Sequence, residues 1–139
     1  MRLLEGLVLV PTTSKPAEEM DALTETIIGC AFKVSTELGA GFVEKVYENA
    51  LAHELLKKSL NVQQQYPAQV KYDDIIVGEF LCDLLVNQDV IVELKAVKIL
   101  EPVHWAQCLN YLKATGFKVC LLMNFGRKKL EFRRIVNNF

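Results

Sequence analysis

The stretch LCDLLVNQDVIVELKAV, residues 81–97, has the composition of two strands joined by a short loop. Leu, Val and Ile fill most of it, which is typical of strands buried inside a sheet. Three charged residues interrupt the apolar pattern: Asp83, Glu93 and Lys95. Burying such groups without partners is costly. The stretch therefore predicts a central hairpin whose charged side chains share a compensating partner.

The loop length decides whether the two acids meet. Side chains alternate along a strand, so Glu93 and Lys95 share one face. If the loop consists of Asn-Gln-Asp, residues 87–89, Val86 pairs with Val90, and counting back places Asp83 opposite Glu93. A two-residue loop would turn Asp83 to the other face unless a bulge intervened. The sequence allows both arrangements.

Two like charges opposite each other across strands are destabilising, and a shared Mg²⁺ or Mn²⁺ would reverse that effect. Lys95 could then reach the same ligand and assist an attacking water or neutralise charge on a phosphate. The structural alternative is a simple ion pair between Lys95 and one of the acids on a solvated face. The Asp…Glu-x-Lys pattern by itself does not separate the two.

Outward from this hairpin, the chain predicts an α+β fold in the order ααβββαββ. Apolar spacing indicates a helix over 17–38 that stops at Gly39, and a second helix from about Phe42 to Ser59. A third helix begins at Pro102 and ends near Thr115, before Gly116. Strands are expected over the remaining apolar runs, at 62–72, 75–86, 90–97, 118–125 and 129–136. The result is a mixed sheet flanked by helices.

The bulk composition fits one small domain. The 139 residues have a net charge of −1, so no whole-molecule basic field attracts nucleic acid. We expect residues 17–139 to form one domain and residues 1–16 to form an arm through which two copies could pair. The apolar run of this arm is broken by Glu5 and ends at Pro11, without an export-type cleavage site. No stretch approaches membrane length.

Four cysteines stand far apart in apolar runs, without a CxxC pair: Cys30, Cys82, Cys108 and Cys120. Buried free thiols in a reducing cytoplasm explain them better than a disulfide or a zinc site. The expected location is therefore the cytoplasm.

Two further segments carry candidate site residues. Glu44 falls inside the apolar arc of the second helix, although Glu54 does too and a helix-start acid is also favoured by the macrodipole. In the third helix, His104, Gln107 and Tyr111 line up nearly opposite an apolar face that includes Leu109. A Gln and a Tyr one turn apart could hold a phosphate or a metal-bound water, or could form an ordinary wet face.

Five pieces taken in order, GFVEKVY, CDLLV, VIVELKAV, HWAQCLNYLKATG and LLMNFG, resemble the GxxExxY family of the PD-(D/E)XK nuclease superfamily. The resemblance runs from about residue 21 to the C-terminus. It implies a restriction-endonuclease-like core with acids carried on a β-hairpin. Cys82 stands where the superfamily name has proline, which is not a ligand. We expect Gly41 to need an unusual backbone angle, and Tyr47 to face the core with its hydroxyl near the acids.

The resemblance also implies roles for the site residues. Asp83 and Glu93 correspond to metal-binding acids, Glu44 to a helix-borne acid that completes the metal site, and Lys95 to the catalytic lysine. Gln107 and Tyr111 resemble the Gln-x-x-x-Tyr of exonuclease-type branches. The implied function is a Mg²⁺- or Mn²⁺-dependent nuclease, with DNA as the expected substrate.

Two other functions stay open at this point. A nuclease fold can serve as a catalytically silent module that binds nucleic acid or protein, and hydrolysis of another phosphate-containing substrate is chemically possible. A C-terminal group of basic residues could follow a nucleic-acid backbone, or could simply be solvated: Arg127, Lys128, Lys129, Arg133 and Arg134.

Overall fold

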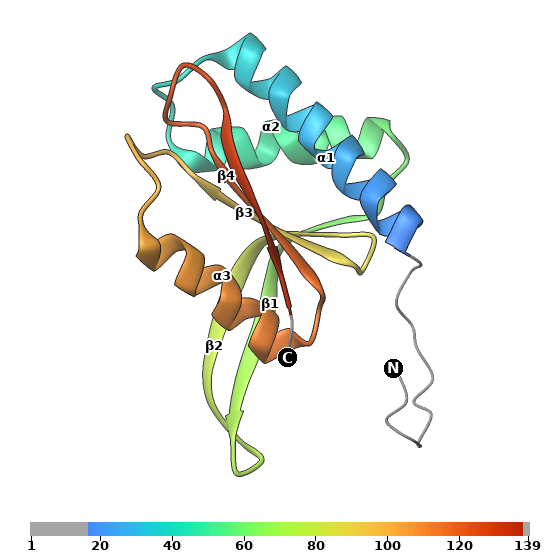
Figure 1. The fold of residues 1–139 in the computed structure, drawn as a ribbon, viewed down its shortest axis with the longest axis vertical. Coiled ribbons are helices and arrows are strands. Elements are labelled where there is room, and N and C mark those ends of the chain that lie inside the picture. The colour runs from blue at the N-terminus through green and yellow to red at the C-terminus, as the bar shows by residue number, and fades with distance from the viewer. Residues whose placement is uncertain (1–16, 138–139) are drawn as a thin grey trace.

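The computed structural model describes residues 17–137, so the expected N-terminal arm lies outside the described residues. Their order is ααβββαββ, as the sequence predicts (Figure 1). The helices are α1 (Ala17–Leu38), α2 (Glu44–Lys57) and α3 (Pro102–Thr115). The strands are β1 (Val62–Tyr72), β2 (Ile75–Val86), β3 (Val90–Lys95), β4 (Val119–Asn124) and β5 (Glu131–Val136).

Glycines end two of the helices as expected. Gly39 has a φ of 71° and donates a 2.9 Å hydrogen bond to the carbonyl of Ser35. Gly116 has a φ of 80° and donates a 2.8 Å hydrogen bond to the carbonyl of Leu112. A left-handed residue after the last helical turn satisfies carbonyls that would otherwise lack a donor.

Helix α2 is shorter than predicted. It begins at Glu44 rather than near Phe42, because Val43 is extended (φ −74°, ψ 159°). It ends at Lys57, because Ser59 has a φ of 63° and cannot continue a right-handed helix. The turn before it contains Gly41, whose φ of 117° confirms the expected unusual backbone angle.

The five strands form one sheet in the order β1-β2-β3-β4-β5. The neighbouring strands are antiparallel except for β3 and β4, which are parallel. A parallel pair requires a crossover, and α3 supplies it. The sheet is therefore mixed.

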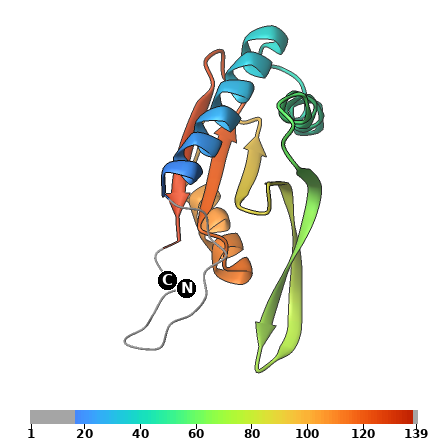
Figure 2. The same ribbon diagram turned by 90° about the vertical axis from the view of Figure 1, so that its right-hand side faces the viewer.

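The helices cover opposite faces of this sheet (Figure 2). Helices α1 and α2 pack on one core with Leu84, Val92 and Leu121, whereas α3 packs on a second core with Leu85, Ile91 and Leu122. These strand residues alternate between the two cores along β2, β3 and β4, which explains the almost continuously apolar sequence of the central strands.

The β1–β2 hairpin is much longer than the rest of the sheet. Its strands have 11 and 12 residues, whereas β3, β4 and β5 have six each. Only Leu84–Val86 of β2 pairs with β3, so the rest of the hairpin extends beyond the sheet (Figure 2). Its turn lies at Asp73 and Asp74, as predicted, with φ values of 52° and 62°. Positive φ at both central residues matches the twist of a tight hairpin.

All four cysteines are buried and free, which agrees with the sequence-based interpretation. No helix within residues 17–137 is long and apolar enough to cross a membrane.

Candidate active site

The carboxylates of Asp83 and Glu93 lie where β2 separates from β3. Val86 pairs with Val90, which confirms the three-residue loop, and the ladder continues only to Leu84 and Val92. At the next position the side chains replace main-chain pairing. The amide of Asp83 donates to Oε1 of Glu93 at 3.3 Å, and the amide of Leu94 donates to Oδ2 of Asp83 at 2.8 Å. The strand register that brings these two acids together, one of the two that the sequence allows, is therefore the one observed.

The sheet is locally irregular at this point. Cys82 and Leu85 both belong to the core on the α3 side, although their spacing should place them on opposite faces. Gln65, next to Asp83 on β1, has a φ of 57°, which is unusual for a residue other than glycine. Such irregularities change the direction in which side chains point. Here the irregularity directs the Asp83 carboxylate toward β3.

The two acids lie in an environment that disfavours their charge. Glu93 is 4% exposed, and burial, followed by the nearby charge of Asp83, raises its pKa to about 8. Burial also raises the pKa of Asp83, with the charges of Glu48 and Glu44 acting in the same direction. A hydrogen bond from the Leu94 amide partly offsets this rise. Clustered carboxylates with raised pKa values are a common property of functional sites.

Lys95 lies beside the pair, on the same face as Glu93. Its ammonium nitrogen is 3.7 Å from Oε2 of Glu93, and its charge lowers the pKa of that carboxyl, against the larger effect of burial. The carbonyl of Lys95 accepts a 2.8 Å hydrogen bond from Phe125, which holds its backbone against β4. The ion pair between Lys95 and one of the acids, which the sequence allows, is therefore present and involves Glu93. An ammonium in this position can also neutralise an anion bound at the pair.

Helix α2 directs two acids to this region. Glu44 is exposed, and its carboxylate accepts a 3.1 Å hydrogen bond from the amide of Ala96, immediately after Lys95. Glu48, one turn later, is 3% exposed. Its carboxylate accepts hydrogen bonds from Gln64 at 2.7 Å and from Gln65 at 2.9 Å.

Gln65 joins α2 to the acid pair. Its side-chain nitrogen donates to Glu48 and lies 3.4 Å from Oδ1 of Asp83. The sequence-based analysis missed both Glu48 and Gln65. The i, i+4 spacing of Glu44 and Glu48 was an available signal, because it places both on one side of the helix. The Gln65 contact depends on strand pairing and has no local signal.

Tyr47 differs from the prediction in one respect. It faces the core and is fully buried, as expected, and it stacks on Phe125 with ring centroids 4.8 Å apart. Its hydroxyl donates to the carbonyl of Gly39 and accepts from the amide of Phe42, rather than lying with the acids. The hydroxyl therefore fixes the turn that precedes α2.

Helix α3 packs differently from the face inferred by periodicity. Leu109 is exposed, and Tyr111 is 3% exposed, on the buried side with Cys108 and Leu112. The buried arc of α3 therefore includes Tyr111 and leaves out Leu109. Burial, then the charge of Glu93, raises the pKa of Tyr111. Gln107, one turn earlier, is half-buried.

The described residues do not contain a ready-made cluster of three or more Asp, Glu, His or Cys side chains that could hold a metal ion. The convergence of Glu44 with Asp83 and Glu93 around a metal therefore stays a prediction. Two of the basic C-terminal residues have protein partners. Arg133 lies 5.7 Å from the Trp105 ring, and Arg134 pairs with Asp21 at 2.9 Å.

A mixed sheet between helices, with a half-buried and a buried carboxylate and a lysine at a strand fork, defines a protein of the restriction-endonuclease-like fold class. The chain belongs to the PD-(D/E)XK nuclease superfamily, whose family model matches residues 21–135. No curated protein matches the chain.

Two solved structures share this fold. The alkaline exonuclease LHK-Exo from Laribacter hongkongensis has a TM-score of 0.51 and 14% identity, over 91% of this chain and 73% of the exonuclease. The structure of SSO0001 has a TM-score of 0.51 and 13% identity, over 88% of this chain and 61% of that protein. At these identities the likeness establishes the fold alone.

Proposed function

We propose that this protein is a metal-dependent nuclease that hydrolyses phosphodiester bonds in DNA, with its active centre at the fork between β2 and β3. The observation that carries the proposal is the pair of carboxylates of Asp83, which is half-buried, and Glu93, which is buried, with the ammonium of Lys95 beside them. Membership of the nuclease superfamily supports the reaction class. One structural neighbour is an alkaline exonuclease, which is consistent with this reaction class.

The donor set suits a hard divalent cation. Mg²⁺ and Mn²⁺ take oxygen ligands from one or two carboxylates, and Asp83 and Glu93 present such oxygens in a region where their own charges are unfavourable. In our proposal these two would hold the ion together with an acid of α2. The family resemblance gives this role to Glu44, whereas Glu48 is the acid that Gln65 connects to Asp83. When bound, the ion would supply Lewis acidity and lower the pKa of a water molecule.

The remaining residues have roles that follow from their positions. Lys95 would hold its ammonium against the attacked phosphate and help to orient the attacking water. Gln107 and Tyr111, one turn apart on α3, would position the phosphate. Because Tyr111 is buried against the sheet, it can also limit access of bulk water to Glu93.

Calorimetry with Mn²⁺ tests the metal site. Wild type should bind the ion, and Asp83→Ala should not. Linear, nicked and single-stranded DNA and RNA then test cleavage. Lys95→Ala should keep metal binding and lose turnover, because its ammonium is not a ligand. Turnover that survives in this variant would remove the role assigned to Lys95.

One observation favours a second candidate, a nuclease-fold module that binds nucleic acid or protein without cleaving it. Both carboxylates are occupied by main-chain amides, and no three potential ligands converge in the described part of the chain. If wild type binds no Mn²⁺ and cleaves none of the four substrates with Mg²⁺ or Mn²⁺, this second function replaces the first.

We also infer three narrower assignments. Gly41, Glu44 and Tyr47 support membership of the GxxExxY family within the superfamily. Four buried free thiols support a reducing compartment such as the cytoplasm. Pairing of two copies through residues 1–16 is a proposal that gel filtration of a chain lacking those residues would test.

A further inference from the structure

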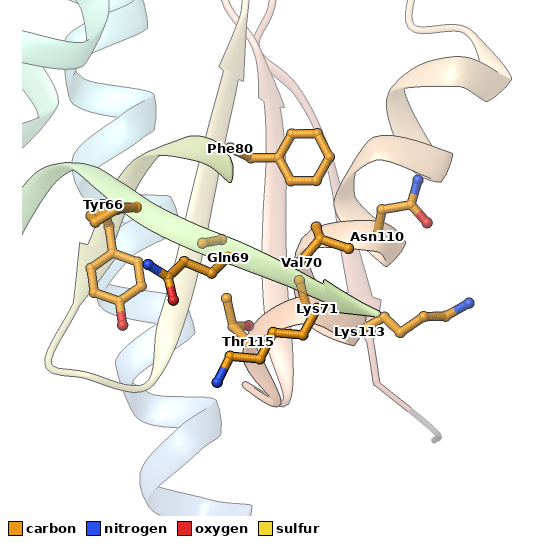
Figure 3. Close-up of a pocket in the computed structure, with 11 residues that line it drawn as sticks. Tyr66, Gln69, Val70, Lys71, Phe80, Asn110, Lys113 and Thr115 are labelled. Carbon is orange, nitrogen blue, oxygen red and sulfur yellow. The ribbon is translucent and has the colours of Figure 1, made fainter. Parts of the chain in front are cut away.

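A cavity of about 730 Å³ lies between β1 and the C-terminal half of α3 (Figure 3). One wall is β1 from Tyr66 to Lys71, together with Phe80 of β2. The other wall is α3, with Asn110, Lys113 and Thr115. A volume of this size lies within the range of sites that hold small molecules or parts of larger ones.

This groove adjoins the acid pair. Gln65, which contacts Asp83, immediately precedes the β1 wall, and Asn110 and Lys113 flank Tyr111 on α3. The rings of Phe80 and Tyr111 have centroids 5.4 Å apart, so the groove residue Phe80 packs on a residue of the proposed active site. The β1 wall begins one residue after Gln65, so a nucleic-acid strand longer than the acid pair can extend toward the groove.

The chemistry of the walls indicates what this ligand is. The charged side chains that line the groove, within the described residues, are Lys71 and Lys113, one on each wall. Phe80 is 39% exposed, and Gln69 and Asn110 add amide groups. Exposed aromatic rings for stacking, together with lysines spaced along a groove, are the features by which proteins hold unpaired nucleic-acid strands. The two lysines make the groove itself favourable for an anionic chain.

We propose that this groove binds a single-stranded segment of the nucleic-acid substrate, with Lys71 and Lys113 on its phosphates and Phe80 stacked on a base. The inference rests on the proposed nuclease function and extends it, because it states that the nucleic-acid strand next to the cleaved bond is unpaired.

Binding without turnover tests this proposal separately from catalysis. Fluorescence anisotropy of a labelled single-stranded oligonucleotide, in EDTA so that no cleavage occurs, would be compared with a fully paired hairpin of equal length. Lys71→Ala combined with Lys113→Ala should weaken single-strand binding about tenfold and reduce the slope of log affinity against log salt by about 1.4. Phe80→Leu, which keeps apolar bulk, should lose about fivefold or more through stacking.

The matched control removes two exposed lysines elsewhere, Lys58 and Lys118. Each double variant removes two positive charges, so both change the wild-type net charge of −1 by the same amount. An equal loss of binding in the control would show non-specific attraction and overturn the proposal. Tighter binding of the duplex than of the single strand would also overturn it. A change of oligomeric state in the groove variant would overturn it too, because the groove would then be an interface with a second copy of the chain.

The outcomes for the two proposals are distinguishable. If wild type cleaves duplex DNA with Mn²⁺ but the groove variants bind and cleave as wild type does, the nuclease function stands and the groove inference fails. If wild type binds single strands through Lys71, Lys113 and Phe80 but cleaves nothing, the groove inference stands and the nuclease function fails. Unchanged thermal midpoints of these surface variants would exclude misfolding as the cause.

Discussion

The main-chain amide of Leu94 donates a 2.8 Å hydrogen bond to Oδ2 of Asp83, across the gap where their strands separate. This bond takes the place of the main-chain pairing that β2 and β3 lose beyond Leu84 and Val92. The carboxylate therefore has a structural role in addition to its proposed role as a ligand.

Substitutions of Asp83 should separate these two roles. Asp83→Asn keeps an acceptor for Leu94 and removes a charge beside Glu93, so the metal-free protein should be at least as stable as wild type while Mn²⁺ binding is lost. Asp83→Ala should be less stable by about 1–3 kcal/mol, since a half-buried amide loses its partner. Urea denaturation and calorimetry measure both effects. Equal stability of the two variants would contradict the structural role.

The raised pKa of Glu93 makes stability depend on pH. Its carboxyl has a pKa of about 8 in the folded protein, above the ordinary 4.5, so the folded state holds the proton more tightly than the unfolded state. In EDTA the contribution of Glu93 to unfolding free energy should be greatest below pH 4.5 and should be lost as pH rises to about 8. Urea midpoints across this interval measure it.

Glu93→Gln supplies the control for this pH effect, because it removes the titrating group. The difference between wild type and the variant should grow with pH, in favour of the variant. Mg²⁺ added at pH 8 should raise the wild-type midpoint and leave that of the variant nearly unchanged. A wild-type profile parallel to that of the variant would show that Glu93 does not titrate in this range.

The two acids of α2 should differ in importance. Glu48→Gln should lower Mn²⁺ affinity more than Glu44→Gln, because Glu48 is buried and connects through Gln65 to Asp83, whereas Glu44 is exposed. Loss of a metal ligand or of a group that orients one typically lowers affinity by about 10–100-fold. Calorimetry on both variants decides the order. The reverse order would make Glu44 the more important acid, as the family resemblance implies.

Gly126 should not tolerate any side chain. A Cβ placed there would lie 2.4 Å from both the amide nitrogen and the carbonyl oxygen of Val97. The side chain of Asn124 bonds those same atoms, at 3.0 Å and 2.9 Å, so the backbone of Val97 cannot easily withdraw. Gly126→Ala should lower the unfolding free energy by about 1–3 kcal/mol.

Gly29→Ala is the matched control for this substitution. No atom lies within 4 Å of a Cβ at position 29, which is inside α1. Alanine there should stabilise the protein by up to about 1 kcal/mol, because it favours the helix. A neutral Gly126→Ala alongside a stabilising Gly29→Ala would show that the segment at Val97 can move.

The sequence predicts the elements well because their signals are local. Apolar spacing and the glycines at 39 and 116 predict α1 and α3. The register that joins Asp83 to Glu93 is one of the two that the sequence allows, and the structure has it. Features that depend on packing were not predicted. Tyr111 is buried because of how α3 lies on the sheet, and the Tyr47 hydroxyl is engaged by a turn eight residues earlier.

The missed part of the candidate site has the same cause. The spacing from Glu44 places Glu48 on the same side of α2, but it does not show that Glu48 is buried. Its partners Gln64 and Gln65 come from the polar start of β1, whose sequence gives no sign of which helix it will meet. Contacts between elements of this kind arise only when the sheet and helix are assembled.

The unequal strand lengths divide the molecule into parts of different local stability. Beyond Leu84 the β1–β2 ribbon has no third strand beside it, and Tyr72, Ile75 and Val77 near its tip are exposed. Its amide protons should exchange with solvent through local opening, whereas those of β3 and β4 should exchange only when the whole chain unfolds. The tip of the ribbon and β3, which carries Glu93 and Lys95 and pairs with β4 along its whole length, thus belong to separate cooperative units, and the tip can open while these two residues stay in place.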